Sequence, residues 1–369
     1  MSGWWWMVSG ERRTVDGERQ TRPTTSPAGL PFSLSPPLNF WIFPVRRLLP
    51  TACCSLLAVL LLLHSALALA AAGPHAEVTR RIGELADKDF RVRWYAVYAL
   101  GQLGVESAAA VGPLTQTLAN RQEDEYVRGG AAWALGQIGP GAAAAVPVLT
   151  QMLTSQLESV RRNSASALGN LGPVAVAAAP QLVALLRDED FVTRIHAAVA
   201  LWQIQHRPES LRSLAQMLHG GQESTRYEAA MALGRLRLDA AAATADLVAA
   251  LRDHQPDTAR AAAWALGQIG PTALASLRPL LSDPDVAVRR GAVESLGWIG
   301  PAAIADLSRA LKNDSPVARQ AAAREIGRLG PDAASAVPAL LEAINDRDAK
   351  VREEAARALR QIQGPGPHP

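Results

Sequence analysis

The chain has 369 residues, and 49% of them are hydrophobic but only 5% are aromatic, so its apolar residues are mostly Ala, Leu and Val. This composition is typical of closely packed helices and argues against a sheet core rich in β-branched and aromatic residues. The formal net charge is +3, but this excess lies in residues 1–72, which hold six arginines and three acids. The remaining body has 31 basic and 31 acidic residues. Its charge therefore gives no reason to expect nucleic acid as a partner.

The N-terminal part divides into two segments. Residues 1–44 contain Trp, Ser and Pro clusters without periodicity, which predicts a disordered extension or a translation start assigned too early. Residues 45–72 begin with Arg46 and Arg47 and continue as an apolar run that ends in small residues. This pattern is typical of a secretory signal peptide, and an uncleaved membrane anchor is the alternative because the run is about 20 residues long.

Both interpretations of residues 45–72 give the same location for the rest of the chain. The arginine pair holds the near side of the segment in the cytoplasm, which places the body outside it. We therefore expect an extracytoplasmic protein, either periplasmic or secreted, or one that is anchored to the membrane by residues 48–72. Contact with the membrane is expected only through this segment, if it is uncleaved.

The body repeats a five-residue landmark, Leu-Gly-x-(Ile/Leu)-Gly, with some degenerate copies. The nine copies begin at Leu100, Leu135, Leu168, Leu201, Leu233, Leu266, Leu296, Ile326 and Leu359. Successive copies are 35, 33, 33, 32, 33, 30, 30 and 33 residues apart. So regular a period predicts an array of stacked supersecondary units.

Each unit divides into two helical halves. The first half has apolar residues at three- and four-residue spacing, and proline often stands near its start. The second half follows a polar turn and ends at the landmark glycine, which suits a left-handed cap. Such pairs bury their apolar faces only by stacking. We therefore predict an all-α fold, an α-solenoid (a right-handed superhelix) of about nine helix pairs over residues 73–363, with a disordered tail at 364–369.

One segment makes a family resemblance specific. Residues 127–136 read VRGGAAWALG and resemble the short HEAT repeats named after phycobilisome lyases. The resemblance extends over about residues 75–363, and it indicates the fold far more strongly than the activity. It implies that the second helices line an inner groove of the superhelix.

An arginine stands seven positions before the landmark in eight of the nine repeats. These arginines are Arg93, Arg128, Arg161, Arg194, Arg226, Arg289, Arg319 and Arg352. The resemblance implies a structural ladder, in which each arginine pairs with a turn acid of a neighbouring unit. The acids that suit this role are Asp89, Asp124, Asp190, Asp285 and Asp348. Binding of a phosphate or carboxylate ligand is the alternative.

The position two residues before the landmark varies, although small apolar residues surround it. It shares one helix face with the residues three before and four after it. This face predicts a partner-binding groove formed by Tyr95, Tyr98, Gln102, Trp133, Gln137, His196, Gln203, Trp264, Gln268, Trp298, Arg324 and Arg328. Exposed Trp and Tyr side chains are typical anchors for a protein or peptide. The alternative is that Trp133 and Trp264 only fill gaps left by alanines.

Catalytic and metal-binding patterns are absent from the sequence. The two cysteines, Cys53 and Cys54, precede the body, and no histidine in it has a metal-ligand spacing. We therefore predict no catalytic residue, metal or cofactor, and interpret the chain as a non-catalytic, monomeric scaffold for a protein or peptide. The alternatives are an enzyme or enzyme subunit similar to a phycobilin lyase or to deoxyhypusine hydroxylase, and a structural spacer. Deoxyhypusine hydroxylase holds iron through paired His-Glu dipeptides, which this sequence lacks.

Overall fold

The computed structural model of the chain describes residues 74–364. In that range the backbone forms helices and connecting turns, and no strand occurs there. The predicted all-α class is therefore confirmed for the described part. The predicted extension at 1–44, the signal or anchor segment at 45–72 and all but the first residue of the tail at 364–369 lie outside the described residues.

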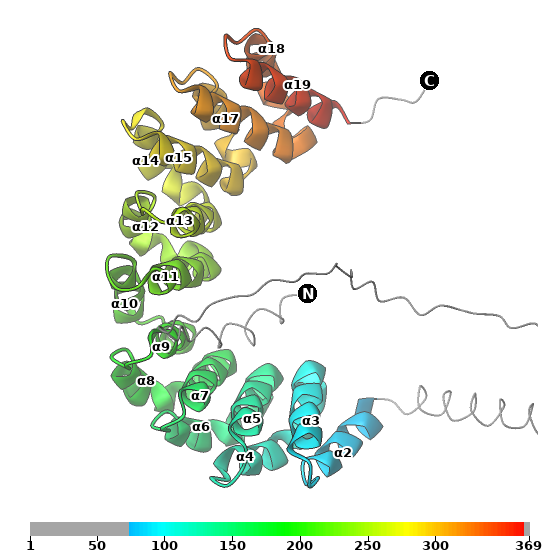
Figure 1. Cartoon of the computed structure of the whole chain (residues 1–369). Coiled ribbons are helices and arrows are strands. Elements are labelled where there is room, and N and C mark those ends of the chain that lie inside the picture. The colour runs from blue at the N-terminus through cyan, green and yellow to red at the C-terminus, as the bar shows by residue number, and fades with distance from the viewer. Residues whose placement is uncertain (1–73, 365–369) are drawn as a thin grey trace, which may run out of the picture. The chain divides into compact units, whose positions relative to one another are not determined.

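Each repeat contributes one long helix of 14 or 15 residues. The long helices are α3 (Phe90–Leu103), α5 (Glu125–Ile138), α7 (Glu158–Leu171), α9 (Phe191–Gln205), α11 (Glu223–Leu236), α13 (Pro256–Ile269), α15 (Val286–Ile299), α17 (Pro316–Leu329) and α19 (Ala349–Gln363). A shorter helix precedes each of them. These are α2 (Pro74–Glu84), α4 (Val111–Ala119), α6 (Val146–Met152), α8 (Ala179–Leu185), α10 (Pro208–Leu218), α12 (Thr244–Ala250), α14 (Leu274–Leu277), α16 (Ile304–Ala310) and α18 (Val337–Ala343). The long helices form one layer of the stack and the short helices the other (Figure 1).

A 3₁₀ helix links most long helices to the next short helix. These segments are Gly104–Ala110, Gly139–Ala145, Gly172–Ala178, Arg237–Ala243, Gly270–Ala273, Pro301–Ala303 and Gly330–Ala336. A further 3₁₀ helix, Arg278–Ser282, follows α14. Proline stands in the first turn of several of these segments, where its fixed φ fits and its missing N–H leaves no bond unmade. The first half of most predicted units is therefore a 3₁₀ turn followed by a short α-helix.

The second glycine of the landmark ends most long helices with a positive φ, as the predicted cap requires, but its ψ, −146° at Gly139 and −145° at Gly300, lies outside the left-handed helical region. Gly139 and Gly300, for example, have φ of +72° and +85°. In the fifth copy Arg237 takes this place with φ +55°. In the fourth and ninth copies the helix continues through Gln205 and Gln363, and the next residue ends it, His206 with φ +50° and Gly364 with φ +73°. At Arg237 ψ is −135°, a combination that L side chains rarely adopt, so this cap is strained.

The first glycine of the landmark serves close packing between repeats. A Cβ atom added to Gly136 would lie 2.8 Å from the Cα atom of Ala167, and one added to Gly169 would lie 2.9 Å from the Cα atom of Ala200. Both neighbours belong to the next long helix. Only glycine lets the two helix backbones approach this closely.

The apolar core divides at α9. One cluster of buried residues extends from Val78 to Ile204 and the other from Ile195 to Ile362, so α9 contributes to both. The division coincides with the degenerate fourth landmark, where α9 runs on to Gln205 and α10 follows without a 3₁₀ segment. The irregular repeat in the sequence is therefore also irregular in the stack.

Two stretches of the stack, Glu125–Met152 and Glu158–Leu185, are long and apolar enough by composition to cross a membrane. Each is broken by a glycine with positive φ, Gly139 in the first and Gly172 in the second. Each consists of a long helix, a 3₁₀ turn and a short helix. About half of each apolar window is buried inside the stack, so these stretches belong to its core.

Candidate functional site

The N-terminal aromatic cluster consists of Trp94, Tyr98 and Trp133. The rings of Trp94 and Tyr98, one turn apart on α3, have centroids 5.7 Å apart and planes 9° apart. The Tyr98 ring then stacks on Trp133 of α5 at 5.6 Å and 11°. The side-chain amide of Gln102 donates a hydrogen bond to the Tyr98 hydroxyl at 2.9 Å. Three predicted groove residues thus come together, and their stacking stabilises the contact between the first two repeats.

Trp94 was not among the predicted groove residues. It stands four residues before Tyr98, and this spacing places both side chains on one face of α3. The sequence therefore carried a signal for it, but the prediction considered only positions three before and four after the variable column. The ring stack extends the predicted face by one aromatic residue toward the amino terminus of α3.

Tyr95 is 52% exposed and has a cation as its neighbour. The Arg81 guanidinium of α2 lies 4.7 Å from the centroid of the Tyr95 ring. Two acids of the same helix hold this arginine, since its Nε donates to Glu77 at 2.7 Å and its Nη1 donates to Glu84 at 2.8 Å. Tyr95 is thus an exposed aromatic ring beside a cation that two carboxylates hold in place. At an exposed position such a cation–π contact is of modest strength.

Trp133 and Trp264 each cover the landmark glycine of the preceding repeat. A Cβ atom added to Gly101 would lie 2.2 Å from Cζ3 of Trp133, and one added to Gly234 would lie 2.3 Å from Cζ3 of Trp264. Both indoles are half-buried. Each therefore fills a gap at a glycine, as the packing alternative expects, and also leaves part of its ring open to a partner.

The middle of the predicted groove carries amides and one histidine. Gln137 and Gln203 are exposed and Gln268 is half-buried. Burial lowers the pKa of His196 to about 4, with the positive charges of Arg162 and Arg235 acting in the same direction. The imidazole is therefore neutral at pH 7, and it adds no charge to this part of the face.

The C-terminal part of the groove combines an aromatic ring with charges. Trp298 is 44% exposed, and the Arg328 guanidinium lies 4.7 Å from the centroid of its ring. The buried carboxylate of Glu325 accepts from Arg328 at 2.5 Å and from Arg324 at 3.4 Å. Burial raises the pKa of Glu325, and the two arginines oppose this rise. Glu325 was not among the predicted residues because it stands one residue after the variable position and therefore on a different face of the helix.

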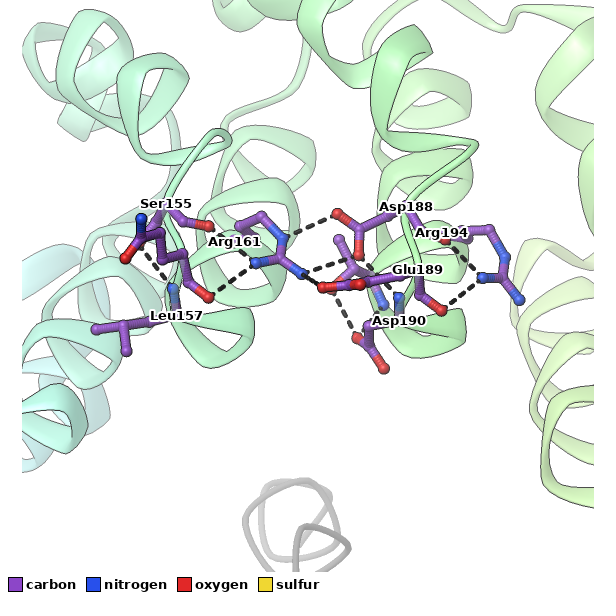
Figure 2. Close-up of polar contacts among 9 residues, drawn as sticks. Ser155, Leu157, Arg161, Asp188, Glu189, Asp190 and Arg194 are labelled. Carbon is purple, nitrogen blue, oxygen red and sulfur yellow. Dashed lines mark hydrogen bonds and ion pairs between the residues drawn. The ribbon is translucent and has the colours of Figure 1, made fainter.

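Arg161 illustrates how a ladder arginine joins two repeats. Its Nε and Nη2 atoms donate to the two carboxylate oxygens of Asp188 at 2.8 and 3.0 Å. Its Nη1 atom donates to the main-chain carbonyls of Ser155 and Gln156 in the turn before α7. Figure 2 shows this arrangement between the two turns. A two-pronged, mostly buried ion pair fixes the register of one repeat on the next.

Four of the eight ladder arginines contact a carboxylate in the following turn. The pairs are Arg93 with Glu123, Arg161 with Asp188, Arg226 with Asp253, and Arg319 with Asp346. The hydrogen bonds described for three others, Arg194, Arg289 and Arg352, go to main-chain carbonyls of their own turns. The eighth is Arg128, which donates to the carbonyl of Leu118.

The acids that were expected to pair with the ladder arginines are not their partners; most of the true partners stand one or two residues earlier in the same turns. Asp89, Asp124, Asp190, Asp285 and Asp348 instead accept hydrogen bonds from main-chain N–H groups at the starts of the long helices. A carboxylate that caps its own helix in this way points back toward the helix and away from the next repeat. The partner of Arg161 or Arg319 lies two residues earlier in the turn, as Asp188 does before Asp190.

The sixth repeat replaces its ladder arginine by another cation. Ala259 stands at the ladder position, and Asp283 of the following turn pairs with Arg252, from the turn after α12. A residue outside the arginine column thus supplies the positive charge.

Within residues 74–364, no group of three or more His, Cys, Asp or Glu side chains is arranged to hold a metal ion.

A protein-family model described as HEAT repeats matches five overlapping stretches, residues 79–169, 112–190, 179–245, 244–324 and 304–367. Together they cover most of the chain. No curated protein sequence matches it.

Among solved structures, the Kap95:Nup1 complex is similar with a TM-score of 0.50 at 13% identity, over 78% of this chain and 45% of that one. Importin beta has a TM-score of 0.48 at 13% identity, over 76% and 44% of the two chains. Human deoxyhypusine hydroxylase is 26% identical over 60% of this chain and 84% of that one, but its TM-score is 0.27. The chain spans less than half the length of Kap95 and importin beta, and at these identities the likeness concerns the fold alone.

Proposed function

This chain belongs to the HEAT-repeat family, and we propose that it is a non-catalytic scaffold that binds a protein or peptide along the exposed face of its long helices. The observation that carries the proposal is the aromatic surface at the amino-terminal end, where the N-terminal aromatic cluster lies beside the exposed Tyr95. Large rings that are braced by packing and partly open to solvent are typical anchors in protein interfaces. Kap95 shares the fold and forms a complex with Nup1, which is consistent with this use of a helical stack.

The two ends of the proposed face differ in composition, so a partner segment would bind in one orientation along it. The aromatic cluster lies on α3 and α5, whereas the arginines and Trp298 lie on α15 and α17. An extended segment would therefore place apolar or aromatic side chains at the first two repeats. It would place an acidic or aromatic group near Trp298 and Arg328, where a cation and a ring are both available.

We further propose that the repeats are of the phycobilisome-lyase-like type and that the scaffold works outside the cytoplasm. The first proposal rests on the resemblance of the VRGGAAWALG segment. The second rests on the charge and hydropathy pattern of residues 45–72. These two proposals concern the repeat type and the cellular location of the scaffold, and the proposed binding face depends on neither of them.

The test compares two exposed rings of the face with an apolar side chain of equal exposure on the other layer. Tyr95→Ala and Trp298→Ala remove the rings, and Leu341→Ala is the control because Leu341 of α18 is 51% exposed. The wild-type protein is used to capture partners from the exported fraction, and the affinity of an identified partner for each variant is then measured by calorimetry.

We expect the partner to bind the wild type and Leu341→Ala equally and each ring variant at least about tenfold more weakly, which is the effect of an interface anchor worth about 1.4 kcal/mol. Circular dichroism checks that the ring variants remain folded. Equal affinity of all four folded proteins for the partner would exclude the proposed face. The capture of no partner at all would favour a structural spacer.

A further inference from the structure

The arginine ladder lacks a carboxylate opposite Arg128. In three other repeats the partner acid stands 27 residues after the arginine, as Asp188 does after Arg161. The residue 27 positions after Arg128 is Ser155. Its hydroxyl accepts from the N–H of Leu157 at 3.2 Å, just as the Asp188 carboxylate accepts from the residue two positions later at 2.9 Å. Ser155 thus occupies the turn position of the acid without supplying its charge.

Arg128 is buried, and no carboxylate among residues 74–364 is in contact with it. Its side chain is 7% exposed, its Nε donates to the Leu118 carbonyl at 3.2 Å, and its Nη2 meets the sulfur of Met152 at 3.4 Å. A thioether is a weak acceptor, and a buried cation is costly unless an anion compensates it. The three acids that most closely precede Arg128 in the chain are engaged elsewhere, because Glu123 accepts from Arg93, Asp124 from the N–H of Tyr126 and Glu125 from Ser159.

A surface pocket of about 510 Å³ opens at this place. It is lined by Arg121, Arg128, Gln151, Met152, Thr154, Ser155, Gln156 and Leu157. The lining contains two cations, several polar side chains and no acid. Of these eight residues Arg128 carries the buried charge, and the exposed Arg121 adds a second positive charge. The pocket therefore has the charge and the donors to receive an anion.

We propose that this pocket binds the carboxylate of an Asp or Glu side chain in an acidic segment of a protein partner, in the place of the missing ladder acid. The Nη2 atom of Arg128 exchanges the weak sulfur acceptor for a carboxylate oxygen, and Arg121 attracts the neighbouring acids of the segment. A carboxylate is the ligand that the same turn position supplies in the paired repeats, as Asp188 does for Arg161. The pocket lies at the amino-terminal ends of the long helices, so it does not depend on the proposed aromatic face.

The test uses a fluorescein-labelled decapeptide of alternating Asp and Gly, with Asn in place of Asp in a control peptide. Binding to the folded protein is measured by fluorescence anisotropy at low ionic strength. We expect the wild type to bind the Asp peptide at least tenfold more tightly than the Asn peptide. Arg128→Gln should lose this preference, whereas Arg212→Gln, which removes an exposed charge from α10, should change the affinity less than twofold.

Two further variants make the test independent of the stability of Arg128→Gln. Ser155→Asp keeps the arginine but completes the ladder, so it should weaken peptide binding about tenfold and raise the melting temperature. Asp188→Ser opens the equivalent place opposite Arg161 and should add a second binding site. Undiminished binding by Ser155→Asp, or equal binding of the Asp and Asn peptides by the wild type, would overturn the proposal.

Discussion

The first glycine of the landmark can be tested at Gly136, where the neighbour is backbone. An alanine Cβ atom there would lie 2.8 Å from Cα and 3.1 Å from Cβ of Ala167. Neither atom can rotate away, so α5 and α7 must separate. Overpacking of this kind costs about 1–3 kcal/mol, whereas replacing glycine by alanine inside a helix gains about 1 kcal/mol. We therefore expect Gly136→Ala to lower the free energy of unfolding by up to about 2 kcal/mol, and to lie about 1–3 kcal/mol below a helix glycine that is replaced without overpacking.

Gly129 of the same helix provides a matched control. The nearest atoms to an added Cβ are Nδ2 of Asn163 at 3.3 Å and Oγ of Ser159 at 3.7 Å, both at the ends of side chains. Gly129→Ala therefore keeps the gain in helix propensity and should stabilise the protein or leave it unchanged. Urea unfolding followed by circular dichroism compares the midpoints of the two variants. If Gly136→Ala unfolds at the same urea concentration as Gly129→Ala, the close approach of the helices is not what requires the glycine.

Three further changes test the ladder, a strained cap and a titrating group. Asp188→Asn removes the two-pronged partner of Arg161 and leaves only the exposed Glu189 carboxylate, 3.9 Å from Nη2, so it should cost about 2–4 kcal/mol. Arg260→Ala, which breaks an exposed pair, should change the unfolding free energy by less than about 0.5 kcal/mol in the same urea titration. Arg237→Gly should raise the melting temperature, since it relieves about 1 kcal/mol of strain at a positive φ; an unchanged or lower value would contradict this. Because the pKa of His196 falls from 6.5 to about 4 on folding, the unfolded chain binds more protons between these values, and stability is lost as the pH falls from 6.5 toward 4 by up to about 3 kcal/mol. His196→Gln should remove this part of the acid sensitivity in melting curves at pH 7 and pH 4.5, and an unchanged difference between the two melts would refute the assignment.

The candidate face was predicted only in part from helix periodicity. Spacing along one helix correctly placed Tyr98 and Gln102 together, because residues four apart share a face. The stacking of Trp133 on Tyr98 joins two helices and was not predictable, since it depends on how far one repeat is rotated against the next. Glu325 was missed for a different reason: it bonds Arg324 and Arg328 of its own helix, but it stands one residue after the variable position and therefore outside the face that the spacing selects.

The repeat period, the two-helix unit, the arginine column and the glycine that ends most long helices could all be predicted from the amino-acid sequence. These are local properties, because helix periodicity and a positive φ are set by a few neighbouring residues. The stacking of the repeats was needed to show that the other landmark glycine, as at Gly136, brings two helices together. It also showed that Arg128 lines a pocket with Ser155, whereas Arg161 pairs with Asp188. These features arise between side chains about 30 residues apart in sequence, and the stacking of the repeats fixes their distance.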